Sequence, residues 1–316
     1  MNELTSTRHN EFIDPALHLW GWEIAVYLFI GGLVAGMMII SGYFIFSGKI
    51  KKPDCASFTL PLVSLVLLSA GMLALFLDLE HKLYVWRLYT TFKIESPMSW
   101  GAWILIMVYP ALAANLLMRP PEILVRKFNK IEDFSRVINS KPFLIKVISV
   151  INMLIGAILG IYTGVLLSAL SARPLWNSSI LWMLFLVSGL SSAAAFVHMI
   201  AKDKDERELL AKADNGFLVL EVFVIALFLI GLMSSSLAGS EAAKILLSGP
   251  YAAAFWVFVV FSGIVIPLIL QFLAVNHKIR HSAVPPIMVI AGGLMLRFVI
   301  VFAGQYSHWH ISDYIK

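Results

Sequence analysis

The first long apolar stretch of the chain is WGWEIAVYLFIGGLVAGMMIISGYFIF, residues 20–46. Glu23 is the single charged side chain within it. A helix needs about 20 mostly apolar residues to cross the hydrocarbon core of a membrane, and one charge near an end is tolerated. This stretch therefore predicts a transmembrane helix.

Seven further stretches meet the same criterion, so the predicted fold class is an all-α, polytopic membrane protein of eight transmembrane helices. The predicted spans are residues 20–46, 58–79, 100–118, 143–170, 179–201, 216–239, 253–275 and 286–304. We expect two four-helix bundles, residues 20–170 and 171–304. A segment of residues 1–19 precedes them and a tail of residues 305–316 follows.

The composition supports this class and excludes several others. Of the 316 residues, 59% are hydrophobic and 14% are charged, whereas about a quarter would be charged in a soluble protein. A disordered protein, a disulfide scaffold and a nucleic-acid-binding protein are excluded. The single cysteine, Cys55, excludes an iron–sulfur cluster held by this protein alone. Only His198 lies clearly within a span. We therefore predict no haem and no metal site.

The distribution of basic residues predicts the orientation. Seven of the 24 Lys and Arg side chains lie in loops on the side of the termini, fifteen lie in the opposite loops, and two lie within spans. Because cytoplasmic loops carry the excess of positive charge, both termini are expected to face outward. We predict a multi-pass protein of the inner (cytoplasmic) membrane, whose basic loop 119–142 lies against anionic lipid headgroups.

Five polar side chains are expected to share the outer half of the membrane: Glu23, Tyr27, Asp78, His81 and Tyr162. Ionisable groups at this depth are costly, so each needs a partner or a function. An acid, a phenol and an imidazole beside an apolar slot suit a quinone, because its carbonyl groups need hydrogen-bond donors and its redox chemistry needs proton exchange. Glu23, His81 and Asp78 are the candidates for that proton exchange.

Three alternatives stay open from the residues. Arg297 in the last span either forms a structural ion pair with Glu221 or Glu23, or lies on a proton or anion path that could include His198. The protein could instead be a secondary transporter that uses Glu23, Asp78 and Arg297. It could also be a purely structural anchor.

Three segments resemble the NrfD/PsrC family of membrane subunits from polysulfide-reductase-like complexes. They are WGWEIAVYLFIGGLVAG (20–36), LDLEHKLYVWRLYTTFKIESPMSWGAW (77–103) and YTGVLLSALSARPLWN (162–177). Within the second segment, SPMSWGAW is the most specific piece. The small residues of GGLVAG are typical of close helix packing.

The resemblance implies an eight-helix anchor that binds quinone or menaquinone and carries no cofactor of its own. It further implies electron transport in anaerobic respiration, with a ferredoxin-like, four-cluster iron–sulfur subunit and a molybdopterin catalytic subunit on the periplasmic side. The outward loop 80–99 would dock the iron–sulfur partner. By the motif, the pocket tyrosine of the family falls on Tyr162. Tyr27 occupies the position of a first-helix histidine in the polysulfide reductase branch, so Glu23 or His18 is expected to supply the proton.

Overall fold

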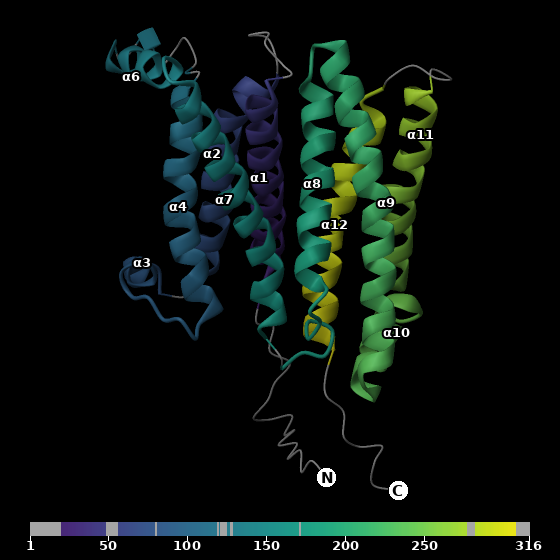
Figure 1. Cartoon of the computed structure of the whole chain (residues 1–316). Helices are drawn as coiled ribbons and strands as arrows, with labels where there is room; N and C mark the ends of the chain where they lie inside the picture. The colour runs from purple at the N-terminus through teal and green to yellow at the C-terminus, as the bar shows by residue number, and fades with distance from the viewer. Residues whose placement is uncertain are drawn as a thin grey trace, which may run out of the picture.

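The computed structural model of the protein is a bundle of long, roughly parallel and antiparallel helices (Figure 1). It describes residues 20–48, 56–79, 81–118, 120, 125–126, 129–170, 172–276 and 282–307. No β-strand occurs among these residues.

The eight predicted transmembrane helices are confirmed, since eight helices within the described ranges are long and apolar enough to cross a membrane. They are α1 (Trp22–Ser47), α2 (Ala56–Asp78), α4 (Pro97–Met118), α7 (Pro142–Ser168), α8 (Leu181–Ile200), α9 (Lys204–Ser235), the continuous pair η2 (Ala254–Val265) and α11 (Ile266–Val275), and α12 (Val284–Tyr306). The first part of the seventh helix, η2, is π-helical.

The helices pack as two groups, with α1, α2, α4 and α7 in the first and α8, α9, η2–α11 and α12 in the second (Figure 1). The first helix, α1, joins the groups because it also packs against α8 and α12. Small residues allow this close approach: a side chain on Gly36 would overlap Gly189 and Ala193 of α8. This confirms the interpretation of GGLVAG as a packing motif.

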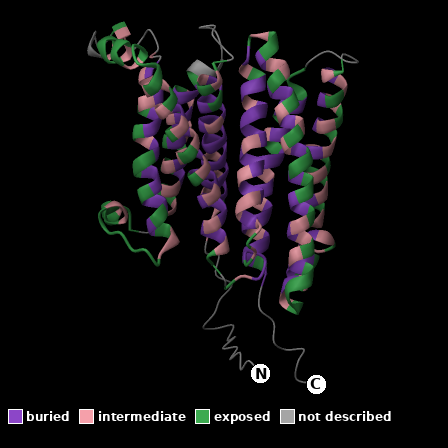
Figure 2. Ribbon diagram, viewed as in Figure 1, coloured by how far each residue is buried: buried purple, intermediate pink, exposed green. Residues whose placement is uncertain are grey.

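Burial identifies α1 as the central helix. In its most apolar window, 83% of the residues are buried, against 28% for α7. The helix α8 is also largely buried, at 67%, whereas outer helices such as α2, α7 and α9 are buried on the side that faces the bundle and exposed on the opposite side (Figure 2). An apolar exposed face is what lipid contact requires. The first helix, α1, is therefore the one around which both groups pack.

The sixth span differs from the prediction. Its helix, α9, begins at Lys204 instead of residue 216 and ends at Ser235 instead of residue 239. Charged residues at its start lower the local hydropathy without breaking the helix, because most of them are good helix formers. After α9, the Ser236 hydroxyl accepts a hydrogen bond from the Gly239 N–H (3.0 Å) and caps a separate helix, α10 (Leu237–Leu247).

Two predicted loops contain short helices, and they mark the two ends of the bundle (Figure 1). The loop 80–99 holds η1 (Lys82–Tyr84) and α3 (Trp86–Thr90) at what we call the α3 end. The loop 119–142 holds α6 (Asn129–Asn139) at the opposite, α6 end. Because α1 begins and α12 ends at the α3 end, this is the end that the charge distribution predicts to face outward.

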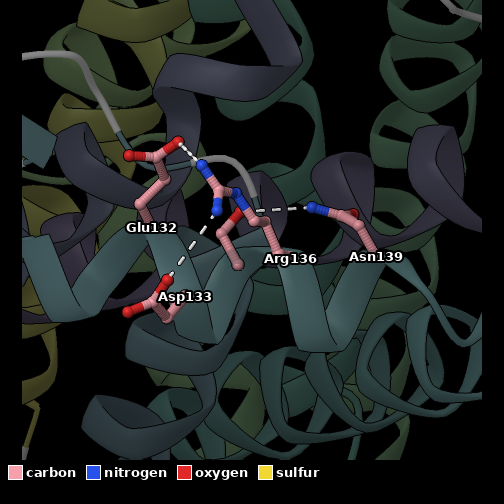
Figure 3. Close-up of polar contacts among 5 residues, drawn as sticks. Glu132, Asp133, Arg136 and Asn139 are labelled. Carbon is pink, nitrogen blue, oxygen red and sulfur yellow. Dashed lines mark hydrogen bonds and ion pairs between the residues drawn. The ribbon is translucent and has the colours of Figure 1, made fainter.

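The helix α6 is tied to the end of α4. The Asn139 side-chain amide donates to the Met118 carbonyl (2.8 Å) and to the Ser135 hydroxyl (3.2 Å). On the exposed side, Arg136 pairs with Glu132 (2.6 Å) and more distantly with Asp133 (3.9 Å) (Figure 3). The Asn139 contact satisfies one of the carbonyl groups that the end of α4 leaves without a helical partner.

Candidate functional site

Three tyrosines from different helices meet near the α3 end. Tyr27 of α1 and Tyr162 of α7 are both buried, and Tyr27 lies close enough to Tyr162 and to Tyr89 of α3 for their phenol groups to interact electrostatically. The Tyr162 ring reaches across to α4, where a side chain on Gly101 would overlap its hydroxyl and ring carbons. Glycine at position 101 therefore makes the space that Tyr162 occupies.

The SPMSWGAW motif also fixes the loop in front of these tyrosines. The Ser99 hydroxyl accepts a hydrogen bond from the Lys93 N–H (3.0 Å) and donates to the Thr91 carbonyl (3.2 Å). The Trp100 indole donates to the Ile94 carbonyl (2.7 Å). These bonds hold the segment after α3 against the start of α4, so the motif shapes this end of the bundle.

A cavity of about 600 Å³ opens between the end of α2, α3 and the start of α4. It lies in the size range of small-molecule sites. Its lining combines polar or charged side chains with apolar or aromatic ones. The first set is Asp78, His81, Arg87, Thr91, Lys93, Ser96 and Ser99, and the second is Leu79, Tyr84, Val85, Leu88 and Met98.

Side chains of opposite charge line the cavity. The Asp78 carboxylate accepts a hydrogen bond from the Gly21 N–H and lies within electrostatic range of Glu23. On the other side, the Arg87 guanidinium lies over the Tyr84 ring at 4.8 Å from its centroid, a cation–π arrangement that fixes its direction. The His81 ring meets Tyr84 edge to face, at 6.4 Å between centroids. The acid Asp78, the base His81 and the cation Arg87 thus all line one cavity.

The phenol of Tyr89 lies outside the membrane-spanning segments. Burial raises the pKa of Tyr89 above its ordinary value of 10.0, and the neighbouring Tyr109 raises it further. Tyr89 therefore stays protonated, and stays a hydrogen-bond donor, throughout the physiological range.

The third motif, RPLW after α7, joins the two helix groups. Arg173 donates to the Ser307 carbonyl at the end of α12 (3.1 Å). The Trp176 indole donates to the Ile300 carbonyl (2.9 Å) and stacks on Trp20 at 5.2 Å between centroids. This segment therefore holds the end of α7 against α12 and against the start of α1.

Most of the predicted site residues gather at the α3 end, in two adjacent sets. Asp78 and His81 line the cavity, whereas Tyr27 and Tyr162 form the buried tyrosine cluster. Glu23 lies next to Asp78. The predicted ligand His18 lies outside the described residues.

Sequence reasoning missed two contributors to this end, Tyr89 and Arg87. Their signal is the aromatic and basic content of the loop 80–99, which the sequence analysis interprets only as a docking surface. Within the described part of the protein, no group of three or more His, Cys, Asp or Glu side chains is arranged to hold a metal ion.

Comparison with known proteins identifies the family. Residues 8–307 match the model of the family described as "Polysulphide reductase, NrfD". The chain belongs to the NrfD family. It is 31% identical to the polysulfide reductase C subunit from Wolinella succinogenes over 304 residues, which cover 91% of this sequence and 94% of that protein. It is 29% identical to the NrfD homolog of Haemophilus influenzae, with 94% and 97% covered, and 28% identical to NrfD of Escherichia coli, with 92% and 96% covered.

The protein is thus an NrfD-family membrane subunit, and the resemblance found in its three motifs is confirmed. The structure gives each motif a role in this NrfD-family protein. GGLVAG allows α1 to pack closely on α8. SPMSWGAW makes space for Tyr162 and holds the segment after α3. RPLW binds to α12 through the Trp176 indole.

Proposed function

We propose that this NrfD-family subunit binds a quinone or quinol at the α3 end and exchanges its electrons with an iron–sulfur partner. The observation that carries the proposal is the cluster of the buried Tyr27 and Tyr162 with the half-buried Tyr89, next to a cavity lined by Asp78 and His81. Phenol hydroxyl groups on an apolar wall match quinone carbonyl groups, and the rim supplies groups that take up and release protons.

The residues divide into two roles. Tyr162, Tyr27 and Tyr89 would hold the quinone headgroup by donating hydrogen bonds, and Tyr27 and Tyr162 are buried from water. The quinone supplies the electron and proton chemistry when bound. Glu23, Asp78 and His81 would carry its protons to and from the α3 side, with His18 as a further candidate.

The surface above the cavity fits a protein partner. Leu83 and Ile94 are 89% and 71% exposed, and Trp86 and Phe92 are exposed beside them. None of these residues belongs to a membrane-spanning helix. Exposed apolar side chains in a segment between membrane-spanning helices are typical of a docking site. The occupant we propose is the ferredoxin-like iron–sulfur subunit, with a molybdopterin subunit beyond it.

The orientation follows from the charge distribution. With fifteen Lys and Arg residues in the segments at the α6 end and seven in those at the α3 end, the partner would lie on the periplasmic face of the inner membrane. Protons released on quinol oxidation would then enter the periplasm. The menaquinone class is the one that the family resemblance implies.

Titration of a fluorescent quinone analogue into the full-length protein in lipid nanodiscs tests the binding site. Tyr162→Phe removes one hydrogen-bond donor, so its Kd is expected to rise by roughly 2- to 10-fold. Glu23→Gln should leave binding nearly unchanged and slow quinol oxidation by the native complex.

The matched control is Tyr43→Phe, the same substitution on an exposed tyrosine near the α6 end of α1. This substitution should change neither the Kd of the quinone analogue nor the rate of quinol oxidation. Unchanged analogue binding and turnover in both Tyr162→Phe and Glu23→Gln would contradict the site. Gentle purification of the native complex, with iron and molybdenum content measured on the co-purifying subunits, tests the partners.

A further inference from the structure

The end of the last helix contacts the segment that leads into the first helix. The side-chain amide of Gln305, on α12, pairs with the backbone of Trp20. Its Oε1 accepts a hydrogen bond from the Trp20 N–H (3.0 Å), and its Nε2 donates to the Trp20 carbonyl (2.9 Å). An amide that accepts from and donates to the same residue fixes both the position and the direction of that residue. Because Gln305 is buried, little water competes for these two bonds.

Trp20 is held by its side chain as well as by its backbone. Its ring stacks on the Trp176 ring at 5.2 Å between centroids, and the Trp176 indole donates to the Ile300 carbonyl of α12 (2.9 Å). The missing side chain of Gly304 makes room for this indole, since a Cβ at that position would overlap it. The end of α12, from Ile300 to Gln305, therefore holds Trp20 in two independent ways.

The helix that carries Gln305 is itself anchored within the second helix group. Arg297 lies about two turns before Gln305 and is buried. It donates to the carbonyl groups of Phe185 on α8 (2.8 Å) and Gly293 (3.2 Å). It also interacts electrostatically with Glu221 of α9, one of the two partners that the sequence predicts for it. These contacts give the end of α12 a fixed support.

The two acids of the proposed quinone site lie next to the same segment. The N–H of Gly21, one residue after Trp20, donates to the Asp78 carboxylate of α2. The Glu23 carboxylate folds back over Gly21, because a Cβ at position 21 would overlap its Oε2. Asp78 and Glu23 consequently lie within electrostatic range of each other. The backbone of Gly21 thus sets the position of both acids.

The start of α1 lacks a capping side chain of its own. Gly21 is the N-cap residue, it has an extended backbone (φ −82°, ψ −166°), and no side-chain hydrogen bond caps the helix there. Glycine also has more backbone freedom than any other residue. The order of this segment therefore depends on contacts from other helices, and α12 supplies them through Gln305.

We propose that Gln305 is a positioning residue of the quinone site, an inference that rests on the function proposed above. By holding Trp20, it keeps Gly21 bonded to Asp78 and keeps Glu23 beside it, so both acids stay where they can exchange protons with the quinone. Gln305 itself does not touch the quinone. The second helix group thus completes a site whose other residues lie in the first group and in the loop 80–99.

Loss of this contact should affect turnover more than binding. The quinone headgroup would be held by Tyr27, Tyr89 and Tyr162, whose places are set by the packing of α1, α3 and α7, whereas proton exchange depends on the two acids. Gln305→Leu should therefore lower kcat for quinol oxidation by the native complex on the order of 10-fold. The Kd of the fluorescent quinone analogue should stay within about 2-fold of the wild-type value.

Two further variants separate the hydrogen bonds of Gln305 from the folding of α12. Gln305→Glu keeps an acceptor for the Trp20 N–H and loses the donor to the Trp20 carbonyl, so its kcat should lie between those of the wild type and Gln305→Leu. Tyr306→Leu changes the neighbouring exposed residue, whose ring meets Tyr251 at 6.2 Å between centroids, and should leave kcat unchanged. If Gln305→Leu does not fold, Gln305→Glu takes its place in every measurement.

A double-variant cycle with Glu23→Gln distinguishes positioning from a general structural role. If Gln305 acts through the acids, Gln305→Leu should lower kcat much less in the Glu23→Gln protein than in the wild type. A general loss of structure would lower kcat by the same factor in both backgrounds. Equal factors would therefore overturn the proposal.

Hydrogen exchange of backbone amides gives a second readout that needs no quinone. In the full-length protein in lipid nanodiscs, the amides of Trp20 and Gly21 should exchange roughly 5- to 10-fold faster in Gln305→Leu than in the wild type or Tyr306→Leu. Equal exchange rates would show that Gln305 does not hold this segment, and the proposal would fail. If the wild type does not bind the analogue but the exchange rates still differ, the quinone site is wrong and Gln305 remains the residue that positions the two acids.

Discussion

The hydroxyl group of Tyr162 lies in the space that the missing side chain of Gly101 leaves on α4. This relationship joins α7 to α4 within the first helix group, and Gly101 is the glycine of SPMSWGAW. It also sets the position of the tyrosine that we propose to bind quinone.

Gly101→Ala tests that relationship. The added methyl group would overlap the Tyr162 ring, so the ring must shift, and we expect a stability loss of about 1–3 kcal/mol. The Kd of the quinone analogue should rise together with it. The control is Gly216→Ala, where a side chain meets no atom within 4 Å, so the same substitution should be neutral or slightly stabilising. If Gly101→Ala and Gly216→Ala bind the quinone analogue equally well, Gly101 does not contribute to the quinone site.

The buried Arg297 provides a second prediction. Arg297→Met leaves Glu221 as a buried carboxylate without its cation, and it should lower the free energy of unfolding by about 3–5 kcal/mol. The double variant Glu221→Gln/Arg297→Met removes both charges and should be less destabilised than the sum of the single variants. Thermal unfolding in detergent measures this difference. Strict additivity would show that the two groups do not interact.

Alkaline pH should affect the protein through Tyr89. Its pKa is raised in the folded state above 10.0, so the unfolded protein loses this proton first. The stability contribution is fully present below about pH 10 and is lost as the pH rises toward the folded-state pKa. Tyr89→Phe should therefore lessen the fall of the unfolding midpoint above pH 10, while Tyr43→Phe should not. A wild-type and a Tyr89→Phe curve that stay parallel through this range would refute the assignment.

The contacts of α6 predict a contrast between two neighbouring residues. Asn139→Ala removes the bond to the Met118 carbonyl (2.8 Å) and should cost about 1 kcal/mol. Arg136→Ala breaks exposed ion pairs (Figure 3) and should cost at most about 0.5 kcal/mol. Chemical unfolding of the two variants under identical conditions measures both, and the reverse order would show that α6 is held by its charges.

Sequence reasoning placed the ionisable residues of the proposed site at one end of the bundle for a clear reason. A carboxylate or histidine at the edge of an apolar span is visible in the sequence, and helix direction brings Glu23, Asp78 and His81 to the same side. It did not find Tyr89, because a tyrosine in a loop carries no signal of the neighbour it meets. Tyr162 was assigned by motif, and its contact with Gly101 depends on how α7 packs on α4.

The sequence by itself determined the number of spans, their order and the fold class, because insertion into lipid depends on the apolar content of each segment taken alone. Only the tertiary structure decided which polar groups face one another. Asp214 shows the difference: in the sequence it follows a charged segment just before a span, and in the fold it is buried between Ser191 and Gln271. Burial is a property of the neighbours that packing provides, and those neighbours are 23 and 57 residues away in the sequence.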